Sequence, residues 1–210
     1  MGKRLVFIGL IALLGGCATA STPPPTEGVK AEAGFPSPGT KWAYQTVDQA
    51  GATTRVLYTA LDEATYEGKS VYRMSDGANV LLIDRATRNW VATVREAKER
   101  ASASPNDQGF SFPMWVGKSW EAKYSYNDRD RGLSFSDVTY SWKVEAYEEV
   151  RVPAGSYKAF RLEGSNPFSS STVWYAPELR LIVKRVDQRG PNHYLGTGKY
   201  TTELLEYPAK

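Results

Sequence analysis

Two stretches in the middle of the chain, SWEAKYSY at residues 119–126 and DVTYSWKVEAY at residues 137–147, alternate between apolar and polar side chains. A two-residue period is typical of a β-strand that buries one face and exposes the other to solvent, as antiparallel sheets allow. The aromatic and aliphatic residues occupy the even-numbered positions. We therefore expect the face with Trp120, Trp142 and Val144 to be buried. The face with Glu121, Lys143 and Glu145 should be exposed.

Weaker patterns of the same kind continue on both sides of these stretches, and turn signals such as Asp76-Gly77 separate them. Only residues 95–101 have a composition compatible with a helix, and they could equally extend a strand. Residues 36–210 are therefore predicted to form an all-β domain, either a curved antiparallel sheet, a half-barrel or a barrel-like meander. The further strands predicted are 41–47, 54–61, 70–74, 79–84, 89–94, 157–163, 172–175, 181–187 and 199–207.

A short pattern occurs twice in this domain. The dipeptide FP, followed by a glycine and a tryptophan, appears at residues 35–42 and again at 112–120. The glycine stands three residues before the tryptophan in both copies. The pattern predicts two similar β-meanders, 36–107 and 108–210, that share one core. The alternative is a coincidence between common turn and aromatic motifs.

Two longer motifs follow in the second half: VPAGSYKAFRL at 152–162 and WYAPELRLIVK at 174–184. Together they resemble uncharacterised bacterial envelope lipoproteins that pair a VPAG-x-aromatic hairpin with a WYAP strand. Arg180 departs from that pattern, which has glycine at this place. The resemblance implies the fold and a place in the cell envelope, and it brings no established activity.

The N-terminus has the organisation of a secretory signal. Lys3 and Arg4 precede an apolar run at 5–14, which is too short for a membrane span of roughly 20 residues. The run ends in LGGC at 14–17, which resembles the lipobox of bacterial lipoproteins. That resemblance implies a signal peptide at 1–16 and a Cys17 that carries the lipid, palmitate included. The alternative is a soluble secreted protein with an accidental cysteine.

The residues after Cys17 have the composition of a linker. Small residues, polar residues and three consecutive prolines at 23–25 fill the segment 17–35, which is predicted to be a flexible tether. Ala18 follows the cysteine where an inner-membrane retention signal would place aspartate. By the same resemblance, the protein is expected on the bacterial outer membrane, anchored by its lipid and facing the periplasm.

Composition excludes several classes of function. The chain of 210 residues has 26 Lys and Arg against 23 Asp and Glu, so it lacks the basic excess of a nucleic-acid-binding protein. One Cys and one His allow neither a disulfide framework nor a Cys/His metal cluster. His193 lies in a turn-like segment, and no nucleophile elbow or phosphate loop accompanies it. We expect no catalytic residues, no metal, no cofactor and no enzymatic activity.

The aromatic content leaves three functions open. Six Trp, 13 Tyr and 7 Phe make the aromatic content unusually high, and packing in the core of an antiparallel sheet accounts for most of these residues. Trp90 and Trp115 lie beside expected loops and are the candidates for ligand contact. The first function is a non-catalytic envelope protein that binds another envelope component or a partner protein. The second is a half-barrel carrier of a lipid or an apolar ligand. The third, a wall or glycan hydrolase, has no supporting motif.

Overall fold

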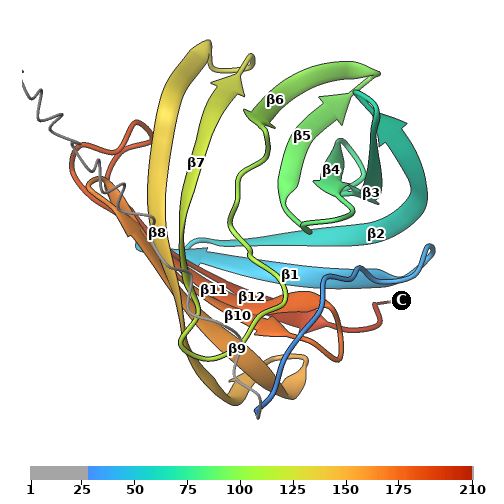
Figure 1. The fold of residues 1–210 in the computed structure, drawn as a ribbon, viewed down its shortest axis with the longest axis vertical. Coiled ribbons are helices and arrows are strands. Elements are labelled where there is room, and N and C mark those ends of the chain that lie inside the picture. The colour runs from blue at the N-terminus through green and yellow to red at the C-terminus, as the bar shows by residue number, and fades with distance from the viewer. Residues whose placement is uncertain (1–27, 210) are drawn as a thin grey trace, which may run out of the picture.

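The computed structural model describes residues 28–209, in which twelve antiparallel strands close into one barrel (Figure 1). The prediction of an all-β domain is confirmed, and a closed barrel is the form that it takes. No helix in the described part is long and apolar enough to cross a membrane. The strands are β1 (Lys41–Asp48), β2 (Thr53–Tyr66), β3 (Lys69–Ser75), β4 (Val80–Asp84), β5 (Trp90–Arg95), β6 (Lys98–Ser104), β7 (Ser119–Asp128), β8 (Leu133–Val152), β9 (Gly155–Asn166), β10 (Ser169–Ala176), β11 (Leu181–Arg189) and β12 (Gly198–Glu206).

The barrel is a meander with two distinct ends. Each strand pairs with its neighbours in sequence and β1 pairs with β12, so successive connections alternate between the two ends. The hairpin end carries the turns after β1, β3, β5, β7, β9 and β11. The plugged end carries the segment 28–40 that precedes β1 and the connection 105–118 between β6 and β7.

The two alternating stretches form β7 and β8 with the predicted faces. Trp142 and Val144 are buried, while Glu121 and Lys143 are exposed. Trp120 is half-buried and stacks on Trp142 at a ring distance of 6.2 Å. The two tryptophans are direct partners across the strands, an arrangement that antiparallel pairing favours for aromatic residues. Glu145 is half-buried rather than exposed. It stands at the β-bulge between Val144 and Ala146, and its carboxylate accepts from the Lys143 ammonium.

Strand β6 is missing from the sequence-based prediction. Residues 95–101 contain a tight turn and the start of β6, and they form no helix. Glu96 and Ala97 make the turn with positive φ angles of 52° and 59°. Such a turn normally contains Gly, Asn or Asp, because those residues adopt positive φ at low cost. The hairpin therefore lacks its usual sequence signal, and pairing with β5 and β7 stabilises it instead.

The plugged end is closed by the chain itself. Ala31 and Met114 exchange two backbone hydrogen bonds of 3.0 and 2.8 Å, which joins segment 28–40 to connection 105–118. Phe35 is buried and stacks on Tyr72 at a ring distance of 5.0 Å. The predicted tether 17–35 is thus wrong for its last residues, because Ala31 and Phe35 pack against the barrel. Residues 17–27 of the tether, Cys17 included, and the signal peptide lie outside the described residues.

The two FP-G-W segments share a backbone hydrogen-bond pattern. In the first, Gly39 N donates to Ala60 O, and Ala60 N donates back to the residue after the glycine, both at 2.8 Å. Gly117 and Val144 are related in the same way in the second, also at 2.8 Å. Both glycines have a positive φ, of 85° and 94°, which a residue with a Cβ rarely adopts. The sequence likeness therefore extends to the local structure that starts β1 and β7.

Candidate ligand cavity

A cavity of about 560 Å³ lies inside the barrel. This volume is within the roughly 300–1,000 Å³ typical of small-molecule sites. At the plugged end, Arg88, Asp107 and Phe110 line it. At the hairpin end, Tyr194 and Leu195 line it. Tyr194 is 46% exposed while it also lines the cavity, which places the rim of the cavity at the hairpin end.

One wall of the cavity is apolar and aromatic. It is built from inward-facing alternate residues of the strands, so the two-residue period that buries the core also provides this lining. Tyr44 donates its hydroxyl hydrogen to the Ile182 carbonyl at 2.6 Å, and burial raises the pKa of this phenol. The wall consists of Trp42, Tyr44, Tyr58, Met74, Leu81, Ile83, Trp90, Tyr124 and Val138.

A polar cluster forms the other wall, on β8, β10, β11 and β12. The strand register places Ser171 opposite Asp187, and Arg185 opposite Thr202, so their side chains share the inner face. Arg185 Nε donates to both carboxylate oxygens of Asp187, at 2.9 and 2.8 Å. Ser171 Oγ donates to Asp187 Oδ1 at 2.5 Å. These contacts hold the Asp187 carboxylate in place and satisfy its oxygens.

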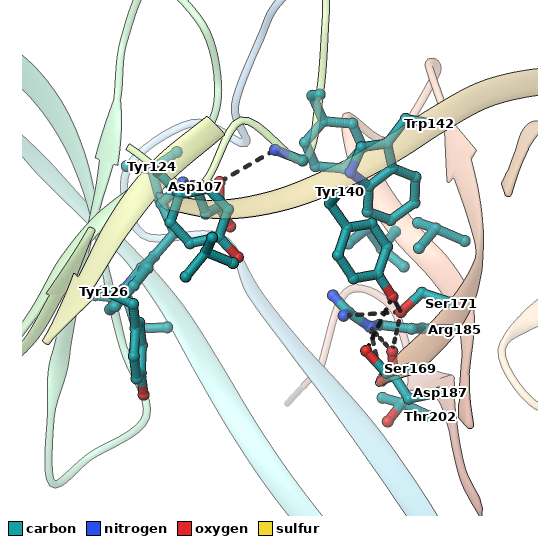
Figure 2. A pocket seen from close by; sticks show the side chains of 18 of the residues that line it. Asp107, Tyr124, Tyr126, Tyr140, Trp142, Ser169, Ser171, Arg185, Asp187 and Thr202 are labelled. Carbon is teal, nitrogen blue, oxygen red and sulfur yellow. Dashed lines mark hydrogen bonds and ion pairs between the residues drawn. The ribbon is translucent and has the colours of Figure 1, made fainter. Parts of the chain in front are cut away.

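Hydroxyl groups extend the polar cluster toward β8. The Tyr140 hydroxyl lies 3.4 Å from Ser169 Oγ and 3.3 Å from Ser171 Oγ. The Tyr140 ring stacks on Trp142 at 5.1 Å, which fixes the direction of its hydroxyl. Figure 2 shows Tyr140, Ser171 and Arg185 converging on one side of the cavity. Asp107 and Tyr124 lie on the other side in the same view.

Arg185 presents its charge to the cavity. Its side chain is 43% exposed although it points into the barrel, so that exposure is toward the interior space. Burial acts to lower the pKa of Arg185, but the Asp187 carboxylate outweighs burial, and the pKa lies above its usual value. Arg185 therefore stays cationic, and its terminal nitrogens face the cavity.

A second set of charged groups lies at the plugged end. Asp107 Oδ1 accepts from Trp90 N at 3.0 Å and from Gly109 N at 3.4 Å. Burial raises the pKa of Asp107 to about 6, although these N–H groups and two arginines oppose the rise. Arg88 is buried, donates to the Arg180 carbonyl at 2.8 Å and lies 4.5 Å above the centre of an aromatic ring of the plug. Its Nε has no hydrogen-bond partner among the described residues.

Aromatic rings form the rim at the hairpin end. Tyr194, in the loop between β11 and β12, contacts Phe135 at a ring distance of 5.2 Å and Tyr126 at 6.3 Å. His193 stacks on Tyr194 at 4.6 Å, and its Nδ1 accepts from Leu195 N at 3.1 Å. Burial and the nearby Arg189 lower the pKa of His193, so the ring is largely neutral at pH 7. The loop thus crosses from one side of the rim to the β7–β8 hairpin.

The two predicted contact residues have different locations. Trp90 lines the cavity, and its Nε1 donates to Thr93 Oγ1 at 3.2 Å. Trp115 is buried in the plug with the Lys118 ammonium 4.5 Å from its ring centre, so it is not the exposed contact that was expected. Trp115 is buried because connection 105–118 folds over the end of the barrel. The sequence around Trp115 does not indicate that this loop closes the barrel.

The polar cluster was not predicted from the sequence. Arg185 and Asp187 continue the phase of Leu181 and Val183 on β11, both of which are buried. Charged residues that alternate in step with core residues of the same strand indicate that the inner face becomes polar there. This pattern in β11 could have identified the polar cluster from the sequence. Tyr140 could not be joined to them by sequence, because β8 and β11 are not adjacent strands. Among residues 28–209, no group of three or more His, Cys, Asp or Glu side chains could hold a metal ion.

Three solved bacterial structures are similar to this chain. One, described as an exported protein with a YmcC-like fold from Bacteroides fragilis, is 12% identical with a TM-score of 0.42, over 84% of this chain and 98% of that chain. One described as a lipoprotein from Parabacteroides distasonis is 12% identical with a TM-score of 0.37, over 81% and 95%. The hypothetical lipoprotein YmcC from Escherichia coli is 11% identical with a TM-score of 0.42, over 84% and 91%. No known family and no curated protein matches the chain.

Proposed function

We propose that this protein is a lipid-anchored envelope protein whose barrel binds a small, largely apolar molecule in its interior without transforming it. The observation that carries the proposal is the cavity of about 560 Å³ with an aromatic wall, closed at one end by the plug. Cavities of this size, apolar with a few convergent polar groups, are the usual form of small-molecule sites. Anchoring through Cys17 on the periplasmic side of the outer membrane is part of the proposal.

The closed barrel favours a ligand inside over a partner strand at an edge. An unpaired edge strand recruits partners because its N–H and C=O groups lack hydrogen bonds. Each of the twelve described strands has two neighbours, so this route is closed to them. Of the functions considered, the carrier of an apolar ligand is therefore better supported than the binder of a partner protein.

The rim histidine supports binding rather than catalysis. A general base needs a free nitrogen within about 2.6–3.2 Å of the proton that it removes. His193 Nδ1 accepts from Leu195 N, so the neutral ring carries its proton on Nε2 and neither nitrogen is a free base. The ring also stacks on Tyr194. These contacts organise the loop between β11 and β12, and they account for the residue without a chemical step.

Filling the cavity tests the proposal. The full chain is placed in phosphatidylcholine nanodiscs, with empty discs as the blank, and titrated with the apolar dye N-phenylnaphthylamine. Leu81→Trp adds a large ring to the cavity wall, whereas Leu57→Trp makes the same change on an exposed outward position. We expect Leu81→Trp to weaken dye binding by about tenfold or more, the effect of losing roughly 1.4 kcal/mol, and Leu57→Trp to leave it unchanged. Saturable binding that is equal in both variants, or absent from the wild type, contradicts the proposal.

A further inference from the structure

The cavity has two chemically different walls, and this limits its ligand. Tyr58, Leu81 and Trp90 belong to the apolar wall, whereas Tyr140 and Arg185 belong to the polar cluster. A purely apolar ligand against the polar cluster would strip water from its donors without replacing the lost hydrogen bonds, which is costly. A ligand that fits both walls has an apolar chain and one polar end.

The hydrogen bonds of the polar cluster indicate the charge of that end. Both oxygens of Asp187 already accept hydrogen bonds, from Arg185 Nε and from Ser171 Oγ. Arg185, by contrast, uses Nε for this ion pair, and its only other side-chain hydrogen bond among the described residues is a long one of 3.5 Å to Ser171 Oγ. The terminal guanidinium nitrogens, which can only donate, are therefore left free, and the nearby hydroxyls can donate as well. Donors that face a cavity suit an acceptor, and a cation suits an anion.

The charges of the residues that line the cavity also favour an anionic ligand end. Arg88, Arg185 and Arg189 line the cavity as cations, against Asp107 and Asp187 as anions. Within the Arg185–Asp187 ion pair, the positive and negative charges cancel. The remaining arginines outnumber the remaining carboxylate, so an added anion lowers the electrostatic energy of the interior.

Arg185 is better placed than Arg88 to hold an anion. The Arg88 guanidinium donates to the Arg180 carbonyl and stacks on Phe35, so it is a part of the plug. Arg185 has its guanidinium in the open part of the cavity, and Tyr140 lies on the same side (Figure 2). A planar guanidinium binds carboxylates through two parallel hydrogen bonds, and a neighbouring phenol can add a third.

We infer that the cavity binds a single-chain carboxylate amphiphile of the fatty-acid type, with its carboxylate on Arg185 and Tyr140 and its chain along Tyr58, Leu81 and Trp90. This inference rests on the proposed function and adds the chemical class of the ligand. The cavity volume of about 560 Å³ suits one chain rather than the several chains of a membrane phospholipid.

Three probes of equal chain length test the charge. Dodecanoate, its neutral methyl ester and dodecylamine are titrated against the full chain in phosphatidylcholine nanodiscs, with empty discs as the blank. Binding is read from tryptophan fluorescence, because Trp42, Trp90 and Trp142 line the cavity. We expect dodecanoate to bind about tenfold or more tightly than the ester, the preference that one charge-assisted hydrogen bond provides. Dodecylamine should bind more weakly than the ester.

Variants locate the carboxylate. Arg185→Gln should remove the preference for dodecanoate over the ester while ester binding stays within about twofold. Arg189→Gln is the matched control: it removes the same charge from the same face of β11, but that guanidinium lies over the Tyr200 ring at 4.3 Å. Because the carboxylate is placed on Arg185, Arg189→Gln should reduce the preference far less than Arg185→Gln does. Tyr140→Phe keeps the ring and removes one donor, and it should reduce dodecanoate binding severalfold even if Arg185→Gln fails to fold.

The outcomes separate this inference from the proposed function. Equal binding of dodecanoate and its ester, or tighter binding of dodecylamine, overturns the carboxylate while an apolar ligand still binds. A preference that survives both Arg185→Gln and Tyr140→Phe overturns the assigned residues. If the wild type binds none of the three probes and no dye, the proposed function itself fails.

Discussion

The Trp142 indole lies flat on Gly164, its direct partner on the neighbouring strand β9. A Cβ atom at position 164 would stand 2.4 Å from Trp142 Cε3, far inside van der Waals contact. The absence of a side chain at Gly164 therefore lets the indole lie against the barrel wall. There it supports Tyr140, whose ring stacks on the indole at 5.1 Å. The position of the Tyr140 hydroxyl thus depends on a glycine of β9, two strands away from β11, which carries Arg185.

Gly164→Ala should destabilise the barrel by about 1–3 kcal/mol, the usual cost of overpacking a core. The added methyl group has to push the Trp142 ring toward the cavity. Urea unfolding measures the loss, and Gly109→Ala is the control because its Cβ would meet nothing closer than 3.8 Å. Equal stability of the two variants would show that the Trp142 ring can move away from the added methyl group without loss of folding free energy.

Asp107→Asn should change how stability depends on pH. Burial raises the pKa of Asp107 to about 6 from the ordinary 3.8, so the folded protein holds this proton more tightly than the unfolded chain. The stabilisation is complete below about pH 4 and is lost as pH rises through 6. The variant keeps the Oδ1 acceptor and lacks the titration. Its stability relative to the wild type should therefore increase between pH 4 and pH 7, by at most about 3 kcal/mol.

Urea unfolding at several pH values measures this difference. The exposed Asp62→Asn serves as the control, since it removes a carboxylate outside the cavity. A variant-to-wild-type difference that stays flat from pH 4 to pH 7 would mean that Asp107 ionises freely, in contact with water.

Tyr194→Ala should speed the exchange of ligand with the cavity. Tyr194 bridges the β11–β12 loop to Phe135 and Tyr126 across the rim, and the change removes both contacts. Stopped-flow displacement of dodecanoate should show release faster by about fivefold to tenfold, the effect of losing roughly 1 kcal/mol of aromatic contact. Phe168→Ala, an exposed aromatic in the adjacent β9–β10 turn, is the control. Identical release rates in wild type and Tyr194→Ala would remove the loop from the ligand's path.

Cys17→Ser should block lipid attachment and leave an unprocessed precursor. In the proposed anchor, the thiol is the acyl acceptor of the lipobox-like sequence LGGC at 14–17. Intact-mass analysis should show acyl groups and a new N-terminus at Cys17 in the wild type, and neither in the variant. Ala18→Ser, which keeps the cysteine, is the control and should be processed normally. A wild-type mass without acyl groups, cleaved at another residue, would contradict the anchor.

The local periodicity of the sequence was enough to predict most of the strands and, for β7 and β8, which face is buried. Alternation at 119–126 and 137–147 identifies two strands and their buried residues, because a strand places successive side chains on opposite faces wherever it lies. The same reasoning places Trp90 beside a loop but cannot separate it from Trp115. One lines the cavity and the other is sealed in the plug, a difference that depends on where connection 105–118 packs.

Closure of the barrel, and with it the candidate site, was decided by tertiary structure. Strand β6 forms without a turn signal, because β5 and β7 pair with it on both sides. Tyr140 meets Ser171 across 31 residues of sequence, and Arg185 faces Asp107 only because β1 pairs with β12 to enclose a common interior. Side-chain alternation is a property of each strand alone. Which inner faces come together, and whether they leave space between them, depends on long-range pairing that no local pattern records.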